Sequence, residues 1–182
     1  MAINSKYVVS FRRKLEGKTD YKKRMGMLKS DLNRVVVRLK NSSCVVQLIK
    51  YEEVGDVTLV NTNSIELKKL GWKNSLGNLP AAYLTGYMFG KKAQKMGFKE
   101  GIFDLGMRSM VKGSRLVVLM KGVIDSGFNI PADIKEYLPT EDRIKGVHIA
   151  QYSQNKELPK GQFNENKSKS IDKDFEEIKK KL

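Results

Sequence analysis

Three short segments between residues 34 and 63 constrain the fold of this chain more than any other feature. They read RVVVRL (34–39), CVVQLIKY (44–51) and DVTLVNT (56–62), and each is rich in β-branched side chains. Residues that favour turns separate them, at 40–43 and at 52–56. β-Branched segments bounded by such turns are typical of strands. The pattern predicts an antiparallel meander of three strands.

The first of these strands predicts a charged face on the sheet. Successive side chains of a strand point to opposite faces. Arg34 and Arg38 therefore share one face with Val36, while Val35 and Val37 share the other with Leu39. One face can join a hydrophobic core, and the other presents guanidinium groups that are able to meet phosphate.

The segments after the meander predict helices and one further strand. Residues 64–70 suggest a short helical turn, Pro80 opens a helix that runs to about Met96, and 102–105 reads as a buried strand. Apolar residues recur at helical spacing between Ser114 and Gly127, and a short helix is expected from about Glu141. The helix–strand order predicts an α/β fold that contains the meander; the resemblance described below implies that its sheet is mixed and packs against helices.

Charge divides the chain into three parts. It has 35 Lys and Arg against 20 Asp and Glu, a net charge of +15, which predicts a polyanionic partner. Residues 1–30, including FRRKLEGKTDYKKR (11–24), are interpreted as a basic arm with a short helix over 21–29 that Asp20 caps. Residues 31–152 form the α/β body. Residues 153–182 are interpreted as a polar tail, expected to be mobile, with a frayed helix over its closing DFEEIKKKL (174–182).

Several classes of function lack the residues that they need. The chain has one cysteine and one histidine, too few for the zinc sites that these residues build. No glycine-rich nucleotide loop occurs in a strand-to-helix setting, and no apolar run reaches the roughly 20 residues that span a bilayer. We expect no catalytic residue, metal, cofactor, membrane partner or small-molecule substrate, and a reducing, intracellular setting.

Two alternatives to a non-catalytic, nucleic-acid-binding protein remain open. Asp104 ends the predicted buried strand, where nucleases of ribonuclease H-like architecture present a carboxylate to Mg²⁺. Such cleavage needs several converging acids, and a structural Asp104 bonded to backbone or to an arginine is the favoured interpretation. A basic module for acidic proteins or membranes is the other alternative, although a strongly amphipathic cationic helix is missing.

Motifs spread over most of the chain resemble one family. Arg12-Arg13 is followed by EGKTDY (16–21), and later motifs include RVVVR (34–38), GWKNSLGNLPAAYLTG (71–86), DLGM (104–107), KGSRL (112–116), MKGVIDSG (120–127) and EDRIKGVHIAQY (141–152). This set is similar to the L-eighteen family of large-subunit ribosomal proteins, archaeal type, whose eukaryotic equivalent is called L-five.

The resemblance implies a function and a fold. It implies a cytoplasmic protein of the large ribosomal subunit without enzymatic activity, which binds 5S rRNA and helps to seat it in the central protuberance. Its expected partners are 5S rRNA, the large-subunit rRNA and neighbouring ribosomal proteins. It also implies a body similar to a ribonuclease H-like motif, without the acids of the nucleases.

Carried over to this sequence, the resemblance implies three RNA-binding groups. The arm and the charged face of the sheet supply Arg12, Arg13, Lys14, Lys18, Tyr21, Lys22, Lys23, Arg24, Arg34 and Arg38. Trp72 and Lys73 form the second group, in a polar loop for which simple packing of the tryptophan at an edge of the fold is an equal alternative. The third is Arg108, Lys112 and Arg115, near the start of the helix after Ser114, where free backbone N–H groups also attract phosphate.

Overall fold

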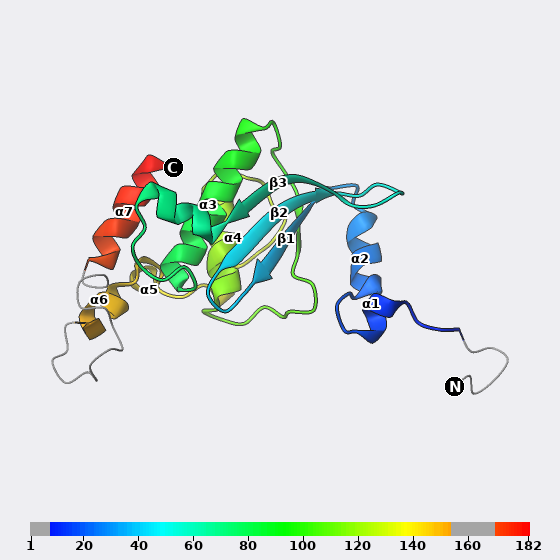
Figure 1. Ribbon diagram of the computed structural model, residues 1–182, viewed down its shortest axis with the longest axis horizontal. Coiled ribbons are helices and arrows are strands. Elements are labelled where there is room, and N and C mark those ends of the chain that lie inside the picture. Colours follow the sequence, from blue (N-terminus) through cyan, green and yellow to red (C-terminus); the bar gives the residue numbers. More distant parts are fainter. Residues whose placement is uncertain (1–7, 154–169) are drawn as a thin grey trace.

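A four-stranded mixed sheet forms the centre of the molecule. The computed structural model describes residues 8–153 and 170–182 (Figure 1). The sheet order is β3-β2-β1-β4, with β1 antiparallel to β2, β2 antiparallel to β3 and β4 parallel to β1. The predicted meander is confirmed, and the strands are β1 (Arg34–Leu39), β2 (Cys44–Lys50), β3 (Val57–Asn63) and β4 (Ile102–Asp104).

Helices cover one face of the sheet and extend past its end. The predicted helical turn is the 3₁₀ helix η1 (Ser64–Leu70), and the two predicted long helices are α3 (Leu79–Lys95) and α4 (Arg115–Asp125). Beyond them lie η2 (Lys135–Tyr137), α5 (Glu141–Lys145), α6 (Val147–Ser153) and α7 (Ile171–Lys181), while α1 (Arg12–Leu15) and α2 (Tyr21–Leu28) belong to the arm. The arm and α7 lie at opposite ends of the molecule (Figure 1). Within the described part of the chain, no helix combines the length and apolar character that membrane crossing needs.

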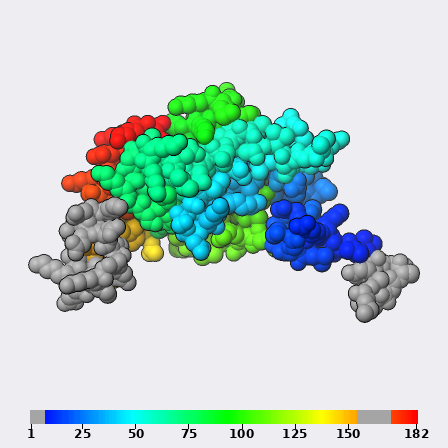
Figure 2. Space-filling view, in the orientation of Figure 1, coloured from blue at the N-terminus to red at the C-terminus, as the bar shows by residue number. Residues whose placement is uncertain are grey.

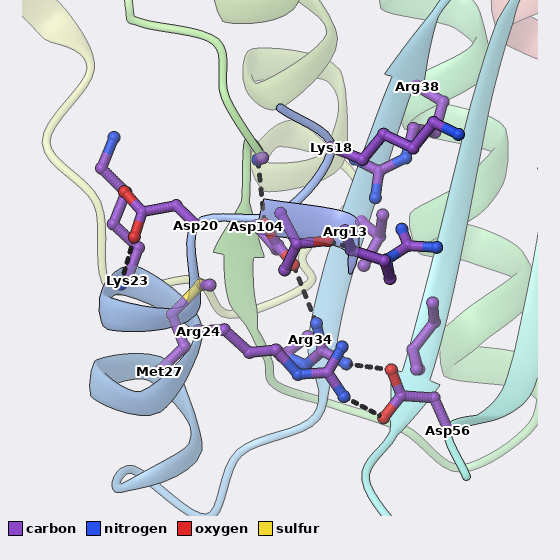
Figure 3. Close-up of a pocket in the computed structure, with 14 residues that line it drawn as sticks. Arg13, Lys18, Asp20, Lys23, Arg24, Met27, Arg34, Arg38, Asp56 and Asp104 are labelled. Atoms are coloured by element: carbon purple, nitrogen blue, oxygen red, sulfur yellow. Dashed lines mark hydrogen bonds and ion pairs between the residues drawn. The ribbon is translucent and has the colours of Figure 1, made fainter. Parts of the chain in front are cut away.

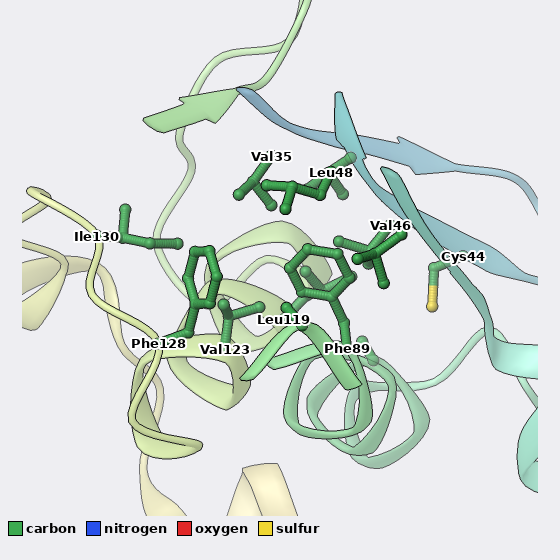
Figure 4. Close-up of a cluster of buried hydrophobic side chains, with 13 residues drawn as sticks. Val35, Cys44, Val46, Leu48, Phe89, Leu119, Val123, Phe128 and Ile130 are labelled. Atoms are coloured by element: carbon green, nitrogen blue, oxygen red, sulfur yellow. The ribbon is translucent and has the colours of Figure 1, made fainter. Parts of the chain in front are cut away.

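The main core lies between the sheet and helices α3 and α4, as the alternation in β1 predicts. Val35, Val37 and Leu48 face it from the sheet, and Phe89 and Leu119 face it from the helices (Figure 4). Burying one such side chain contributes roughly 1.5–3 kcal/mol, so this face of the sheet is fixed by hydrophobic burial.

Two glycines let α3 and α4 cross in backbone contact. A Cβ at Gly86 would overlap the Leu119 carbonyl, and a Cβ at Gly122 would overlap the Tyr83 carbonyl. Only glycine removes the side chain that would keep the two helices apart. The close crossing lets one compact helical layer cover the narrow sheet.

The C-terminal helix α7 corrects part of the sequence-based interpretation. Ile171, Phe175 and Ile178 are buried and join a second apolar cluster with Leu84 of α3 and Ile144 of α5. Residues 171–181 therefore form a packed helix, where the sequence predicts a mobile tail that ends in a frayed helix. Residues 154–169 of the predicted tail lie outside the described residues, and the division of the chain into arm, body and tail otherwise stays a prediction.

Polar contacts also hold α7 against α3. Lys179 donates from Nζ to the Tyr83 hydroxyl oxygen at 2.9 Å, and the Tyr83 hydroxyl donates to Asp125 Oδ2 at 2.8 Å. Burial and the Asp125 carboxylate raise the pKa of Tyr83. The phenol therefore stays protonated and remains a donor, with the Lys179 ammonium 5.0 Å from its ring centre.

Replacing the central anchor of α7 tests its packing. Because Phe175 is 3% exposed, Phe175→Ala should lower the free energy of unfolding by about 3–5 kcal/mol. Glu177→Ala, on the exposed side of the same helix, is the matched control and should change it by less than about 0.5 kcal/mol. Urea unfolding measures both, and equal effects would contradict a packed α7.

Candidate nucleic-acid interface

The basic arm contains a capped helix. Asp20 accepts hydrogen bonds from the backbone N–H groups of Lys22 and Lys23, at 3.0 and 3.1 Å, and so caps α2. A carboxylate at this position also complements the positive end of the helix dipole. The predicted helix and its cap are confirmed.

A second short helix, α1, was not predicted and precedes α2 in the arm. Arg12 pairs with Glu16 at 2.7 Å, and Arg13 donates from Nε to Thr19 Oγ1 at 2.9 Å. The rings of Phe11 and Tyr21 lie 5.0 Å apart, which joins the two helices. The arm therefore has local contacts of its own, and it forms a separate lobe beside the sheet (Figure 2).

A chain of ion pairs connects the arm to the sheet. Arg34 donates from Nη1 to Asp104 Oδ2 at 2.8 Å and from Nη2 to Asp56 Oδ2 at 2.7 Å. The other oxygen of Asp56 accepts from Arg24 Nη2 of α2 at 2.9 Å. Four side chains from α2, the β2–β3 turn, β1 and β4 thus form one network (Figure 3).

This network changes the interpretation of Arg34. The alternation in β1 correctly placed Arg34 and Arg38 on the sheet face away from the helices. Arg34 is only 3% exposed, however, and two carboxylates hold it, so its side chain cannot lie on the surface that meets a phosphate backbone. The prediction of a surface contact is wrong for Arg34, whereas Arg38 is exposed as expected.

Asp104 has the structural role that the sequence favoured. Besides its bond to Arg34, it accepts the backbone N–H of Gly106 at 2.9 Å, so both of its oxygens are occupied. Across residues 8–153 and 170–182, no group of three or more His, Cys, Asp or Glu side chains converges as a metal site would require. Asp104 stabilises β4 through Arg34.

A cavity of about 330 Å³ lies between the arm and the outer face of the sheet (Figure 3). Six of the residues that line it are cationic and three are acidic. The cationic residues come from both walls and are Arg13, Lys18, Lys23, Arg24, Arg34 and Arg38. The structure thus brings predicted RNA-binding residues from the arm and from β1 to one place.

The second predicted group is divided between the core and the surface. Trp72 is 3% exposed, and its indole Nε1 donates to the Ser75 carbonyl at 3.0 Å. The tryptophan therefore packs in the apolar cluster beside α7, and the prediction that its ring faces RNA is wrong. Lys73 next to it is exposed.

The third predicted group lies near the start of α4. Arg108 and Lys112 are exposed, although Arg108 also donates to the Leu39 carbonyl at 3.1 Å. Arg115 is half-buried and reaches the carbonyls of Lys40, Asn41 and Gly77, at 3.3, 3.3 and 2.9 Å. Arg115 therefore stabilises the β1–β2 turn, and this group lies apart from the cavity.

Sequence reasoning missed the role of Asp56. It sits in a turn, and nothing in the local pattern shows that its carboxylate bridges Arg24 and Arg34. The sequence carries no signal for this role, because Asp56 lies 22 positions from Arg34 and 32 positions from Arg24.

Together, the mixed sheet, the basic arm and the cationic cavity define a basic α/β protein suited to a polyanion. The sequence matches the family of "Ribosomal large subunit proteins 60S L5, and 50S L18" over residues 5–101. The large ribosomal subunit protein uL18 of Methanocorpusculum labreanum is 47% identical over 154 residues, 85% of this chain and 88% of that protein. The uL18 proteins of Sulfurisphaera tokodaii and Korarchaeum cryptofilum are each 48% identical, over 85% of this chain and 78% of theirs.

The chain therefore belongs to the L5 and L18 family of large-subunit ribosomal proteins. It is a structural constituent of the large subunit of the cytoplasmic ribosome, where it associates with rRNA and other ribosomal proteins, and it is not an enzyme. The resemblance found in its motifs is confirmed.

Removing the Asp104 carboxylate, one of the two that pair with Arg34, tests the ion-pair network. Because Asp104→Ala leaves a buried guanidinium with half of its charge partners, it should lower the free energy of unfolding by about 3–5 kcal/mol. The same substitution in an Arg34→Met background should cost much less, since the charge that needed a partner is gone. Glu53→Ala, an exposed acid in the β2–β3 turn, controls for net charge. Equal losses of unfolding free energy in the unmodified and the Arg34→Met proteins would show that Asp104 and Arg34 are not energetically coupled.

Proposed function

We propose that this chain binds 5S rRNA and helps to anchor it in the central protuberance of the large subunit. Membership of the L5 and L18 family supports a ribosomal RNA partner. The observation that carries the proposal is the exposed basic arm, which stands beside the sheet face that no helix of the α3–α4 layer covers. Several of its cations, among them Arg13, Lys14 and Lys22, have no carboxylate partner among the described residues.

The chemistry of the arm suits RNA with unpaired bases. Arginine offers bidentate donors to a phosphate, and lysine offers a mobile point charge. Phe11 is 69% exposed and lies against Tyr21, so the two rings present a face on which a base can stack. A duplex would supply phosphates only, whereas a folded RNA with loops supplies both.

The proposed RNA-facing set follows from the burial of each candidate. Arg34 and Trp72 are left out because they are buried, and Arg115 because backbone carbonyls hold it. Arg24 is half-buried and acts through Asp56. The residues retained are Arg12, Arg13, Lys14, Lys18, Tyr21, Lys22, Lys23, Arg38, Lys73, Arg108 and Lys112.

A gel-shift comparison tests the proposal directly. Full-length protein should prefer 5S rRNA over a control RNA of the same length, and the triple variant Arg12→Gln, Arg13→Gln, Lys14→Gln should bind 5S rRNA at least about tenfold more weakly. The matched control is Lys173→Gln, Lys180→Gln, Lys181→Gln, which removes the same charge from exposed positions of α7. Equal binding to both RNAs by the unmodified protein would refute the proposal.

Salt dependence measures how much of the affinity comes from phosphates. If about eight phosphates are neutralised, the plot of log K against log salt concentration should have a slope near −6 to −7. The arm variant should lose about two to three units of that slope, roughly 0.7–0.9 for each cation removed. A slope shallower than about −2 would contradict an interface dominated by the basic arm.

A further inference from the structure

Strand β4 forms one edge of the sheet, and its side away from β1 is open. The Ile102 N–H donates to the Asn33 carbonyl at 2.9 Å, so the backbone groups of Ile102 and Asp104 point toward β1. The backbone groups of successive residues in a strand point to opposite sides, so those of Phe103 point away from β1. Neither the N–H nor the C=O of Phe103 has a partner among the residues that the structure describes.

The chain itself covers the start of this edge, and the cover stops for a chemical reason. Just before β4, the Asn129 N–H donates to the Lys99 carbonyl at 2.8 Å, and the Asn129 carbonyl accepts from the Gly101 N–H at 3.1 Å. The next bond of this parallel ladder would join the N–H of residue 131 to the Gly101 carbonyl. Pro131 has no N–H. The ladder therefore ends, and the rest of the edge stays open.

A groove of about 370 Å³ lies along this open edge, between β4 and helix α2 of the arm. Figure 3 shows β4 with β1 on one side and α2 on the other. The walls are mainly apolar, with Met27 from α2 and Ile102, Phe103 and Leu105 from β4 and the residue after it. The volume lies within the range of roughly 300–1,000 Å³ that is usual for ligand pockets. An occupant of the groove thus meets apolar side chains and open backbone groups together.

A glycine in α2 keeps the groove open. Gly26 lies inside the helix, where glycine is less favourable than alanine. Close packing does not require it, because a Cβ at Gly26 would meet no atom within 4 Å. Gly26 does line the groove, so a larger side chain at this position would take up space there. The missing side chain therefore serves the groove and not the packing of the arm.

The charges around the groove favour an acidic occupant. Lys23 and Arg108 line it, both are exposed, and neither has a carboxylate partner among the described residues. Arg108 donates to the Leu39 carbonyl, which leaves its charge without a counterion. The one acid in the lining is Asp104, whose carboxylate already pairs with Arg34. Carboxylates on a partner would complement the two cations.

We propose that this groove is a docking site for an extended segment of a neighbouring protein in the large subunit. The segment adds to the sheet as a further strand and bonds through its main chain to Phe103. One of its apolar side chains enters the groove beside Met27, and acidic side chains lie next to Lys23 and Arg108. The open strand edge is what selects a polypeptide, since it offers backbone donors and acceptors at the spacing of another strand.

The site does not depend on the proposed binding of 5S rRNA. Lys23 and Arg108 belong both to the proposed RNA-facing set and to the border of the groove. Gly26 and the backbone of Phe103 carry no charge and belong to the groove alone. Variants at Gly26 therefore separate the two functions.

A short strand-forming peptide, acetyl-EVTVE-amide, is the first probe. It is titrated to about 10 mM into full-length protein labelled with ¹⁵N, because one short strand is expected to bind with a Kd on the order of 1 mM. The amide resonances of Phe103 and its neighbours should shift and saturate. The same peptide with N-methylated backbone amides should not bind, since it cannot pair with the edge. Acetyl-KVTVK-amide should bind at least about threefold more weakly.

Filling the groove without changing any charge tests its role. Gly26→Leu should weaken the fitted peptide affinity by about tenfold or more. Gly55→Leu is the matched control and should leave it within about twofold, because Gly55 lies in the β2–β3 turn and a Cβ there also meets no atom within 4 Å. The amide spectra show whether both variants are folded. Equal effects of the two substitutions, binding of the N-methylated peptide, or no saturable shift at Phe103 would overturn the groove as a strand site.

Cross-linking in the assembled large subunit identifies the occupant. A photoreactive benzoylphenylalanine at position 108, on the border of the groove, should cross-link to one segment of a neighbouring protein, and Gly26→Leu should abolish that product. Cross-links to rRNA alone, or none that Gly26→Leu removes, would overturn a protein segment as the occupant.

The RNA measurements keep this inference apart from the proposed function. Gly26→Leu should leave the affinity for 5S rRNA within about twofold, because it removes no cation. A larger loss would overturn the assignment of the groove to a protein. Peptide binding that depends on Gly26 in a protein without preference for 5S rRNA would support the groove and refute only the RNA proposal.

Discussion

The ion pairs of the buried Arg34 guanidinium hold together the elements on the outer face of the sheet, the face that α3 and α4 do not cover. Burying a charge without partners is very costly, and Arg34 is held by Asp56 on one side and Asp104 on the other. Each partner belongs to a different element, so the pairing fixes the short strand β4 and the β2–β3 turn to β1. Through Asp56 it also reaches Arg24 and fixes α2. The sheet face that lacks an apolar core is thus organised by charge.

The same pairing gives the carboxylate at the end of β4 a structural role. Asp104 accepts from Arg34 and from the Gly106 N–H, so both of its carboxylate oxygens have partners within the fold. Asp56 and Asp104 pair with Arg24 and Arg34, and Asp20 caps α2, so Arg13, Lys23 and Arg38 have no carboxylate partner among the described residues. In the proposed function, the acids of the cavity stabilise the fold and these cations meet the polyanion.

The sequence predicts well the features that depend on local periodicity and less well those that depend on distant partners. The meander, the two long helices and the Asp20 cap follow from alternation, helical spacing and capping chemistry, and all are confirmed. Arg34 appeared to be a surface residue because its partners stand 22 and 70 positions away. The segment of α7 predicts only a frayed helix at the end of a tail, because just three apolar residues, at helical spacing, lie among its charges. In each case the partner that decides burial is absent from the local pattern.

The position of α7 in the chain has a consequence for the order in which the protein matures. Its anchors Ile171, Phe175 and Ile178 pack on residues of α3 and α5 that the ribosome synthesises earlier, whereas the core under the sheet is complete once Ile130 has emerged. Folding during translation proceeds from the N-terminal side. The sheet core can therefore close while the second cluster still exposes an apolar surface. Until α7 arrives, Leu84 of α3 and Ile144 of α5 lack the apolar side chains that cover them in the finished protein.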